Sequence, residues 1–259
     1  MLLCIDVGNT NTMLGVYEGR GDAATLGPHW RLDTNHERMP DEYAMQLLAF
    51  FNYAGLDSND VEGVAIASGV PPLTNKWKEV CTRYLGHEPL TVHGQMQTDL
   101  TILYDNPAAV GADRVVDAVA AFKRYGGPLC IVDFGTATTF EAVTERGEYL
   151  GGAIVPGINV SANALYERAA ALPKVAIDRP PSAIGRNTTH AMQSGLLFGY
   201  VSLVEGMVAR FKAELGEKTK VVGTGGLAPI IAAETDVIEI IEPWLTLDGL
   251  RMIYELNAK

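Results

Sequence analysis

The sequence predicts an α/β fold made of two similar halves that share one cleft, and three observations lead to it. Short apolar runs alternate with longer amphipathic runs along the 259 residues, which is typical of sheets covered by helices. An apolar strand, a turn with Asp and Gly, and a second apolar strand occur at DVGNT (6–10) and again at DFGTATT (133–139). The acids of these two turns, Asp6 and Asp133, are separated by close to half the chain.

The first half reads as a hairpin followed by helices and a strand. The apolar run at 1–5 predicts a strand, and 13–19 predicts its returning partner after the Asp-Gly turn. Apolar residues at helical spacing predict a helix over 41–56 and another over 73–86, each with a glycine at its end. Between them, 61–72 reads as a buried strand that ends in glycine and two prolines.

The second half of the chain repeats this alternation of strands and helices, so we expect two domains, residues 1–112 and 113–259.

The Pro- and Arg-rich segment 174–190 is the longest irregular piece of the second half, and long irregular loops are often functional. The elements predicted here are a helix from about Asp113 to Gly126, a strand, turn and strand over 128–143, a long apolar helix over 192–216, and a strand, glycine turn and helix over 220–235.

The residues of both turns suit a phosphate group. Glycine lets the backbone approach an anion closely, successive backbone N–H groups bind it, and threonine hydroxyls donate further hydrogen bonds. An aspartate fits beside phosphate only when a cation such as Mg²⁺ lies between them. The alternative is that both aspartates merely cap their turns, but a third glycine turn, GTGG (223–226), favours a nucleotide. We therefore predict that the triphosphate of ATP is held by a metal ion on Asp6 or Asp133 and by Gly8, Asn9, Thr10 and Thr12.

The two turns align with one another without a gap. Chance is one reading, because strand-turn-strand units that contain Asp and Gly are common. The other reading is a duplicated domain, in which each half offers one phosphate-holding turn to a shared nucleotide cleft. Placing Asp6 on Asp133 puts Gly8 on Gly135, Thr12 on Thr139 and Val16 on Val143.

Charge and motif content disfavour several classes of protein. The net charge is −11 and the isoelectric point about 4.9, which disfavours binding to nucleic acid or to an anionic membrane. No G-x-x-x-x-G-K-[ST] motif and no G-x-G-x-x-G after the first strand occur, so the chain has neither a P-loop nor a Rossmann fingerprint.

We expect a cytoplasmic protein. The three cysteines, Cys4, Cys81 and Cys130, form no C-x-x-C pair, and so sparse a number suits a reducing compartment. No basic residue precedes Asp6 and the first apolar run is short, so no signal peptide is expected. No apolar run approaches the roughly 20 residues of a membrane span.

With these turns in view, the chain resembles the acetate kinase, sugar kinase, heat-shock chaperone and actin superfamily. That resemblance implies two ribonuclease-H-like (actin-like ATPase) domains with mixed sheets flanked by helices, and a nucleotide cleft between them. Within the superfamily, the sequence resembles the type III pantothenate kinase family. The segments that carry the resemblance are DVGNTNTMLGVY (6–17), WRLDT (30–34), DEYA (41–44), YDNPAAVGADRVVDAVAA (104–121), IVDFGTATTF (131–140), GGAIVPGI (151–158), IGRNTTHAMQSG (184–195) and GTGGLA (223–228).

The resemblance implies transfer of the ATP γ-phosphoryl group to the primary hydroxyl of pantothenate, which opens coenzyme A biosynthesis. It implies Asp113 as general base, Asp133 as ligand of a monovalent cation (K⁺ or NH₄⁺), and a homodimer whose substrate site is completed by Thr188 of the neighbouring subunit. Asp6 is the candidate for Mg²⁺. The implied ATP-binding residues are Asp6, Val7, Gly8, Asn9, Thr10, Asn11, Thr12, Met13 and Thr136. The implied substrate-binding residues are Tyr104, Gly111, Ala112, Asp113, Arg114 and Thr188.

The chemistry of two of these residues agrees with the implied roles. Asp113 lies at a helix start, where the helix dipole keeps a carboxylate ionised, so it would orient the hydroxyl more than deprotonate it. The Arg114 fork matches the carboxylate of pantothenate. The plain alternatives are a helix N-cap for Asp113 and a surface salt bridge for Arg114.

Two other functions stay open from the sequence. One is a regulatory ATP-binding accessory protein of the same fold, although the acidic charge argues against direct contact with DNA. The other is a kinase for a different small hydroxy-acid or sugar, which only a panel of substrates separates from a pantothenate kinase.

Overall fold

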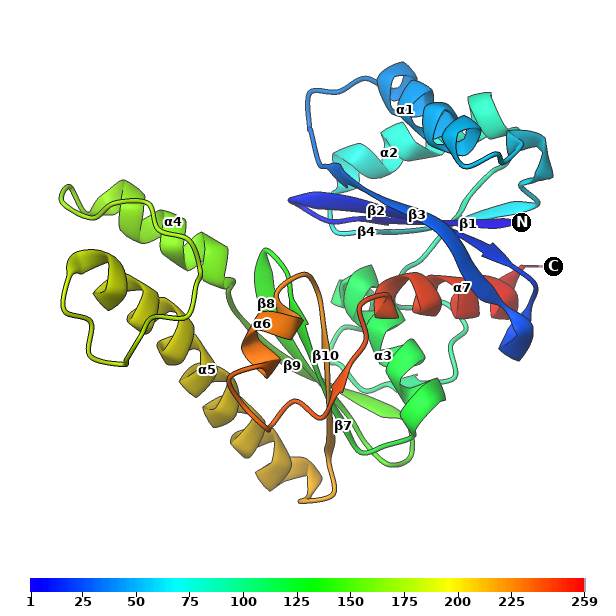
Figure 1. The fold of residues 1–259 in the computed structure, drawn as a ribbon. Coiled ribbons are helices and arrows are strands. Elements are labelled where there is room, and N and C mark those ends of the chain that lie inside the picture. The colour runs from blue at the N-terminus through cyan, green and yellow to red at the C-terminus, as the bar shows by residue number, and fades with distance from the viewer. Residues whose placement is uncertain (259) are drawn as a thin grey trace. The chain divides into compact units, whose positions relative to one another are not determined.

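The computed structural model describes residues 1–258, and these form two compact units (Figure 1). The first unit combines Met1–Lys123 with the C-terminal segment from Leu245 onward, and the second is Arg124–Trp244. The predicted domains, 1–112 and 113–259, stay a prediction. The compact units differ from them because the last helix of the chain packs with the N-terminal residues.

The sheet of the first unit is mixed and has the strand order β3-β2-β1-β4-β5. The central strand β1 is antiparallel to β2 and parallel to β4, while β2 is antiparallel to β3. The strands are β1 (Leu2–Val7), β2 (Asn11–Glu18), β3 (Thr25–Asp33), β4 (Gly63–Ser68) and β5 (Leu90–Thr91), and the unit also holds the two-residue strand β6 (Thr101–Ile102).

Helices cover both faces of this sheet (Figure 1). Leu3, Ile5 and Val7 alternate along β1 and pack into one apolar core with residues of α1 and α2, such as Leu47 and Trp77. The helix α7 lies on the opposite face. The helices are α1 (Pro40–Tyr53), α2 (Pro71–Val80), α3 (Ala112–Tyr125) and α7 (Leu245–Asn257), with short helical turns at Gly21–Ala23, Ser58–Asp60, Cys81–Leu85 and Pro107–Ala109.

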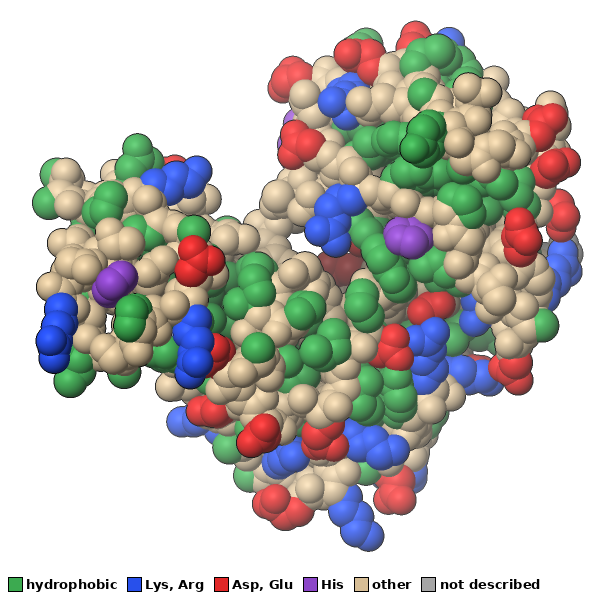
Figure 2. Space-filling model, in the orientation of Figure 1, with side chains coloured by type: hydrophobic (Ala, Val, Ile, Leu, Met, Phe, Trp, Pro, Cys, Tyr) green, Lys and Arg blue, Asp and Glu red, His purple; other side chains and the backbone are tan. Residues whose placement is uncertain are grey.

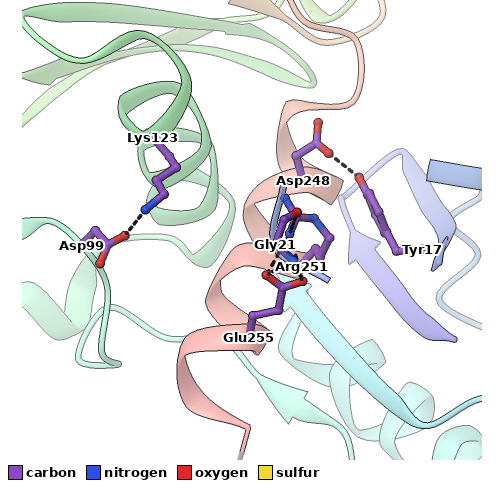
Figure 3. A network of polar contacts seen from close by, with 7 residues as sticks. All are labelled: Tyr17, Gly21, Asp99, Lys123, Asp248, Arg251 and Glu255. Atoms are coloured by element: carbon purple, nitrogen blue, oxygen red, sulfur yellow. Dashed lines mark hydrogen bonds and ion pairs between the residues drawn. The ribbon is translucent and has the colours of Figure 1, made fainter. Parts of the chain in front are cut away.

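Polar contacts hold α7 against the N-terminal hairpin (Figure 3). The Tyr17 hydroxyl donates to Oδ1 of Asp248 at 2.7 Å, and both side chains are buried. Arg251 pairs with Glu255 at 2.9 Å and donates to the Gly21 carbonyl at 3.2 Å. Because these partners come from opposite ends of the chain, the first unit is complete only when the C-terminal helix has docked.

The sheet of the second unit repeats the topology of the first. Within residues 124–244, the strands of this sheet follow the order β11-β10-β7-β8-β9, with β7 antiparallel to β8, β8 antiparallel to β9, and β7 parallel to β10. This arrangement matches β5-β4-β1-β2-β3, as a duplicated domain predicts. The strands are β7 (Leu129–Phe134), β8 (Ala137–Val143), β9 (Glu148–Pro156), β10 (Lys220–Thr224) and β11 (Ile240–Ile241).

The register of the two hairpins corrects the predicted alignment by one residue. In the first hairpin Val7 pairs with Thr12, and in the second Phe134 pairs with Thr138. Thr12 and Thr138 are both buried. The residue equivalent to Thr12 is therefore Thr138 rather than Thr139, because the second turn is one residue shorter.

The long helix of the second unit begins earlier than predicted. It starts at Thr188 because the Asn187 side chain accepts a hydrogen bond from the His190 amide at 2.8 Å and caps the helix. The predicted irregular segment is confirmed up to this cap. The helices of this unit are α4 (Ile158–Arg168), α5 (Thr188–Leu215) and α6 (Ala228–Ala232).

Candidate functional site

The first of the two Asp-Gly turns, proposed to hold phosphate, is a tight loop between β1 and β2. The Gly8 amide donates to the Asn11 carbonyl at 3.0 Å, and a Cβ at position 8 would lie 2.9 Å from that oxygen. A larger residue would therefore open the turn. Asn9, Thr10 and Asn11 are exposed at its tip. Their backbone and side-chain donors are accessible to a ligand.

Thr34 fixes this turn from the end of β3. Its amide donates to the Thr10 carbonyl at 2.9 Å, and its hydroxyl lies 2.9 Å from the Thr12 hydroxyl in the buried interior. The sequence predicts no role for Thr34, because its partner Thr12 is 22 positions away and cannot be recognised from local sequence.

Asp6 lies at the carboxyl end of β1, immediately before the turn. It is half-buried and is the cross-strand partner of Met13. The neighbouring Val7 carbonyl accepts a hydrogen bond at 3.1 Å from the amide of Gly69, which follows β4. Since β1 and β4 are parallel, their carboxyl ends meet at one edge, where the turn is also found.

The GADR segment forms the first turn of α3. The Asp113 carboxylate accepts a hydrogen bond from the Arg114 amide at 2.9 Å, and the Val115 amide donates to the Gly111 carbonyl at 3.2 Å. A Cβ at Gly111 would lie 2.5 Å from Oδ1 of Asp113. Glycine at 111 thus leaves the carboxylate room beside the backbone. Ala112 is buried and anchors the helix start.

Arg114 lies beside Tyr104. The guanidinium carbon lies 5.9 Å from the centroid of the Tyr104 ring, which is within the range of a cation–π interaction. Arg114 is buried, with 9% of its surface exposed. The alternative reading of Arg114 as a surface salt bridge does not fit this burial.

In the second unit, three segments converge on Asp133 at the end of β7. Asp133 pairs with Thr224 of β10 and with Thr139 of β8. A Cβ at Gly225 would lie 2.5 Å from Oδ1 of Asp133, and a Cβ at Gly135 would lie 3.3 Å from Oδ2. Gly225 has φ +87°, a conformation that favours glycine. The GTGG turn and the second phosphate turn therefore form one cradle around this carboxylate.

Thr136 and Thr188 also belong to the second unit. Thr136 is exposed at the turn after Asp133, and its carbonyl accepts a hydrogen bond from the Gly157 amide at 3.0 Å. Gly157 precedes α4, so the turn is tied to the start of that helix. Thr188 is the exposed first residue of α5.

The possible metal ligands around Asp6 and Asp133 determine which cations these sites could bind. Within residues 1–258, no cluster of three or more His, Cys, Asp or Glu side chains forms a metal site. Mg²⁺ bound to nucleotides takes one or two carboxylates plus phosphate oxygens and water, so a single aspartate in each unit is compatible with it. The cradle of Asp133 combines a carboxylate with glycine backbone and suits a hard cation in the same way.

A hollow of about 280 Å³ in the first unit is separate from these residues. It adjoins Leu2 and Gly63, at the amino ends of β1 and β4, whereas Asp6 lies near the carboxyl end of β1.

Among the described residues, no helix is long and apolar enough to cross a membrane.

The structure thus brings the predicted residues together in two groups. The first unit holds the turn from Asp6 to Met13 and the segment that carries Tyr104 and Asp113–Arg114. The second unit holds Asp133, Thr136 and Thr188. The roles of these residues in binding and catalysis stay predictions.

By sequence, the chain is similar to proteins of the type III pantothenate kinase family. The family model for type III pantothenate kinase matches residues 2–210. The chain is 51% identical to the type III pantothenate kinase of Roseiflexus sp. (strain RS-1), covering 99% of each chain. It is 49% identical to that of Geobacillus kaustophilus (strain HTA426), covering 100% of this chain and 99% of the relative.

Solved structures support the fold. A putative Baf family transcriptional activator from Campylobacter jejuni has TM-score 0.60 at 18% identity and covers 98% of each chain. A putative 2-dehydro-3-deoxygalactonokinase from Sinorhizobium meliloti has TM-score 0.59 at 10% identity, covering 100% of this chain and 97% of its own. A putative N-acetylmannosamine kinase from Listeria monocytogenes has TM-score 0.57 at 12% identity, covering 100% and 99%. At such identities the likeness shows the fold alone, and it confirms the predicted α/β class.

Proposed function

Because the chain belongs to the type III pantothenate kinase family, we propose that it transfers the γ-phosphoryl group of ATP to the primary hydroxyl of pantothenate. The product is 4'-phosphopantothenate, and the reaction opens coenzyme A biosynthesis. The observation that carries this proposal is the sequence identity of 51% and 49% to two type III pantothenate kinases over nearly their full length.

Asp113 is the proposed general base. Its carboxylate lies in the first turn of α3 and accepts a hydrogen bond from the Arg114 amide at 2.9 Å. In the loose transition state of phosphoryl transfer the hydroxyl proton leaves late. Asp113 therefore acts mainly by accepting a hydrogen bond from the substrate hydroxyl and aiming its oxygen at the γ-phosphorus.

The remaining proposed substrate contacts are Tyr104, Gly111, Ala112 and Arg114. Arg114, whose guanidinium carbon lies 5.9 Å from the centroid of the Tyr104 ring, supplies the cation that pairs with the pantothenate carboxylate. Gly111 and Ala112 bring the backbone to the substrate beside Asp113. The planar guanidinium of Arg114 matches the geometry of a carboxylate.

The nucleotide and its cations are assigned to the two glycine turns. Residues 6–13 are proposed to bind the triphosphate, with Asp6 holding Mg²⁺, and Thr136 is a further proposed ATP-binding residue. Asp133 in its glycine cradle holds a monovalent cation, K⁺ or NH₄⁺. These cations would offset the negative charge of the phosphates in an otherwise acidic protein.

The active form is proposed to be a homodimer in which Thr188 completes the substrate site of the neighbouring subunit. Figure 2 shows hydrophobic side chains exposed over the region of α4 and the start of α5. A second copy of the chain that packed against this region would bury these side chains. The exposed apolar residues of this region are Val160, Leu165, Tyr166 and Ile184.

The proposed compartment is the cytoplasm. Cys4, Cys81 and Cys130 are all buried as free thiols, which suits a reducing environment.

The test is an assay of ADP release with and without pantothenate, run in K⁺ and in Na⁺ buffers. We expect release that depends on pantothenate and is faster in K⁺. Equal rates with and without pantothenate would refute the proposal and favour a regulatory ATPase. Faster release with another hydroxy-acid or sugar in a substrate panel would assign a different acceptor.

A further inference from the structure

Asp6, Met13 and Arg31 form one row across three neighbouring strands of the first sheet. Asp6 on β1 is the register partner of Met13 on β2, and Met13 is the partner of Arg31 on β3. Residues paired in this way point to the same face of a sheet. The row therefore places an arginine on the face that carries the acid of the first phosphate turn.

The Arg31 side chain extends along this row. Its Nε donates a hydrogen bond to Sδ of Met13 at 3.1 Å, so it reaches over β2 from β3. A thioether is a weak acceptor, whereas a guanidinium is a planar fork of donors that matches phosphate oxygens. Arg31 is exposed, so the fork is accessible to an anion.

The spacing of the strands allows the Arg31 side chain to approach a ligand at Asp6. Neighbouring strands lie roughly 4.8 Å apart, so β3 and β1 are separated by roughly 10 Å. A side chain that already contacts Met13 covers much of the distance to the metal ion and phosphates expected at Asp6. The contact with sulfur also limits the rotamers of Arg31, which lowers the entropy lost when an anion binds.

The other residues on this face do not account for Arg31. In the next row, Leu247 of α7 packs at Gly15, with Cδ1 2.8 Å from where a Cβ would stand. Asp33, two residues along β3, is exposed, and an ion pair between two exposed side chains contributes little. Neither neighbour explains a guanidinium that lies against Met13.

We infer that Arg31 is a further nucleotide-binding residue, whose guanidinium binds the triphosphate chain from the β3 side of the first turn. This inference rests on the proposed function, since it places the triphosphate beside Asp6. Arg31 supplies positive charge that the first turn lacks, because residues 6–13 contain no Lys or Arg. It discriminates between nucleotides by the number of phosphates they carry.

The experiment measures nucleotide affinity of the full chain by calorimetry, without pantothenate, for ATP, ADP and AMP. Arg31→Gln should weaken ATP binding about tenfold to a hundredfold, as expected for loss of a charge-assisted hydrogen bond, and should leave AMP binding nearly unchanged. Arg31→Lys should recover part of the loss, because it keeps the charge but not the fork. Arg20→Gln is the matched control, an exposed arginine at the far end of the same hairpin.

Either of two affinity results would overturn the inference, namely unchanged ATP affinity in Arg31→Gln or equal losses for ATP and AMP, and one kinetic result would do the same. A rise in the KM for pantothenate alone would instead assign Arg31 to the acceptor and would also overturn it. Failure of the proposed function is distinguishable, because it appears in the wild-type protein as ADP release that does not depend on pantothenate.

Discussion

The hydroxyls of Thr12 and Thr34 lie 2.9 Å apart in the interior of the first unit, directly beneath the phosphate turn. The Thr34 amide holds the Thr10 carbonyl as well. The turn is therefore fixed from two strands, β2 and β3, before any ligand binds. Such preorganisation lowers the entropy that nucleotide binding must offset.

Replacing Thr34 by Val should destabilise the protein and weaken ATP binding. The substitution keeps the shape of the side chain but leaves the buried Thr12 hydroxyl without this partner, at a cost of about 1–3 kcal/mol. Urea unfolding and the KM for ATP are the measurements. Thr34→Ser keeps the hydroxyl and is the control. Equal behaviour of the Val and Ser variants would show that the hydroxyl pair does not matter.

Asp113→Asn should abolish most turnover while ATP still binds. The amide oxygen of Asn can accept the Arg114 hydrogen bond, so the start of α3 should survive, but the base is lost. We expect kcat to fall about 10²- to 10⁴-fold. Steady-state kinetics and nucleotide calorimetry measure the two effects separately. Asp22→Asn, an exposed site in the first unit, serves as control, and near-normal kcat in Asp113→Asn would contradict the assignment.

Gly225→Ala should displace the Asp133 carboxylate and weaken activation by K⁺. The new Cβ would stand 2.5 Å from Oδ1 of Asp133 and 2.8 Å from the Phe134 backbone. The K⁺ concentration for half-maximal rate should rise, and Tm should fall. Gly126→Ala is matched, because Gly126 also has positive φ (+64°) but nothing within 4 Å of the new Cβ. If both variants respond to K⁺ alike, backbone strain rather than the cradle is responsible.

Tyr17→Phe should loosen the C-terminal helix. It removes the 2.7 Å hydrogen bond to Asp248 in a buried site, which should lower the free energy of unfolding by about 1–3 kcal/mol. Urea unfolding measures the change, and limited proteolysis reports whether α7 detaches. Tyr53→Phe, at a side chain 91% exposed, should change little. If Tyr17→Phe is as stable as Tyr53→Phe, the hydrogen bond between Tyr17 and Asp248 does not stabilise the docking of α7.

Stability should fall in alkaline solution. Burial raises the pKa of Tyr17 well above its usual value, with the Asp248 carboxylate adding to the effect, and burial raises the pKa of Cys130 to about 12. Ordinary values are about 8.5 for Cys and about 10 for Tyr, so above them the native state binds more protons than the unfolded state. These contributions are fully present below about pH 8.5 and are lost as pH rises towards the folded-state values. Urea unfolding between pH 8 and 11 measures this, and the slope above pH 10 should be shallower in Tyr17→Phe.

Local sequence predicted the elements whose signals are local. The two strand-turn-strand units were predicted because an apolar run and a glycine turn are read within about a dozen residues. The start of α5 was placed at 192 instead of Thr188, although Asn187 is a recognisable cap. No prediction was made for α4 or α7. α4 lacks a buried stripe, since Ile158 alone of its residues is buried.

The residues of the candidate site also fall into those that local sequence predicts and those that it does not. Residues that lie within one motif, such as Gly8 in the first turn or Gly111 beside Asp113, were identified because a motif is contiguous. The contacts of Thr34 with Thr12 and of Arg31 with Met13 were not predicted, because each depends on a strand pairing whose register is set by the whole sheet. The contact of Gly225 with Asp133 likewise arises only when β10 pairs with β7.

By itself, the sequence determined the α/β class, the repeated Asp-Gly hairpins and the family, because apolar periodicity, glycine turns and contiguous motifs are properties of short segments. Only the tertiary structure decided which segments meet. It placed α7 on the N-terminal sheet through Tyr17 and Asp248, which are 231 positions apart. It also set Thr138, not Thr139, opposite Phe134. Both outcomes depend on burying side chains against distant partners, and that free energy is a sum over the packed unit rather than over any stretch of chain.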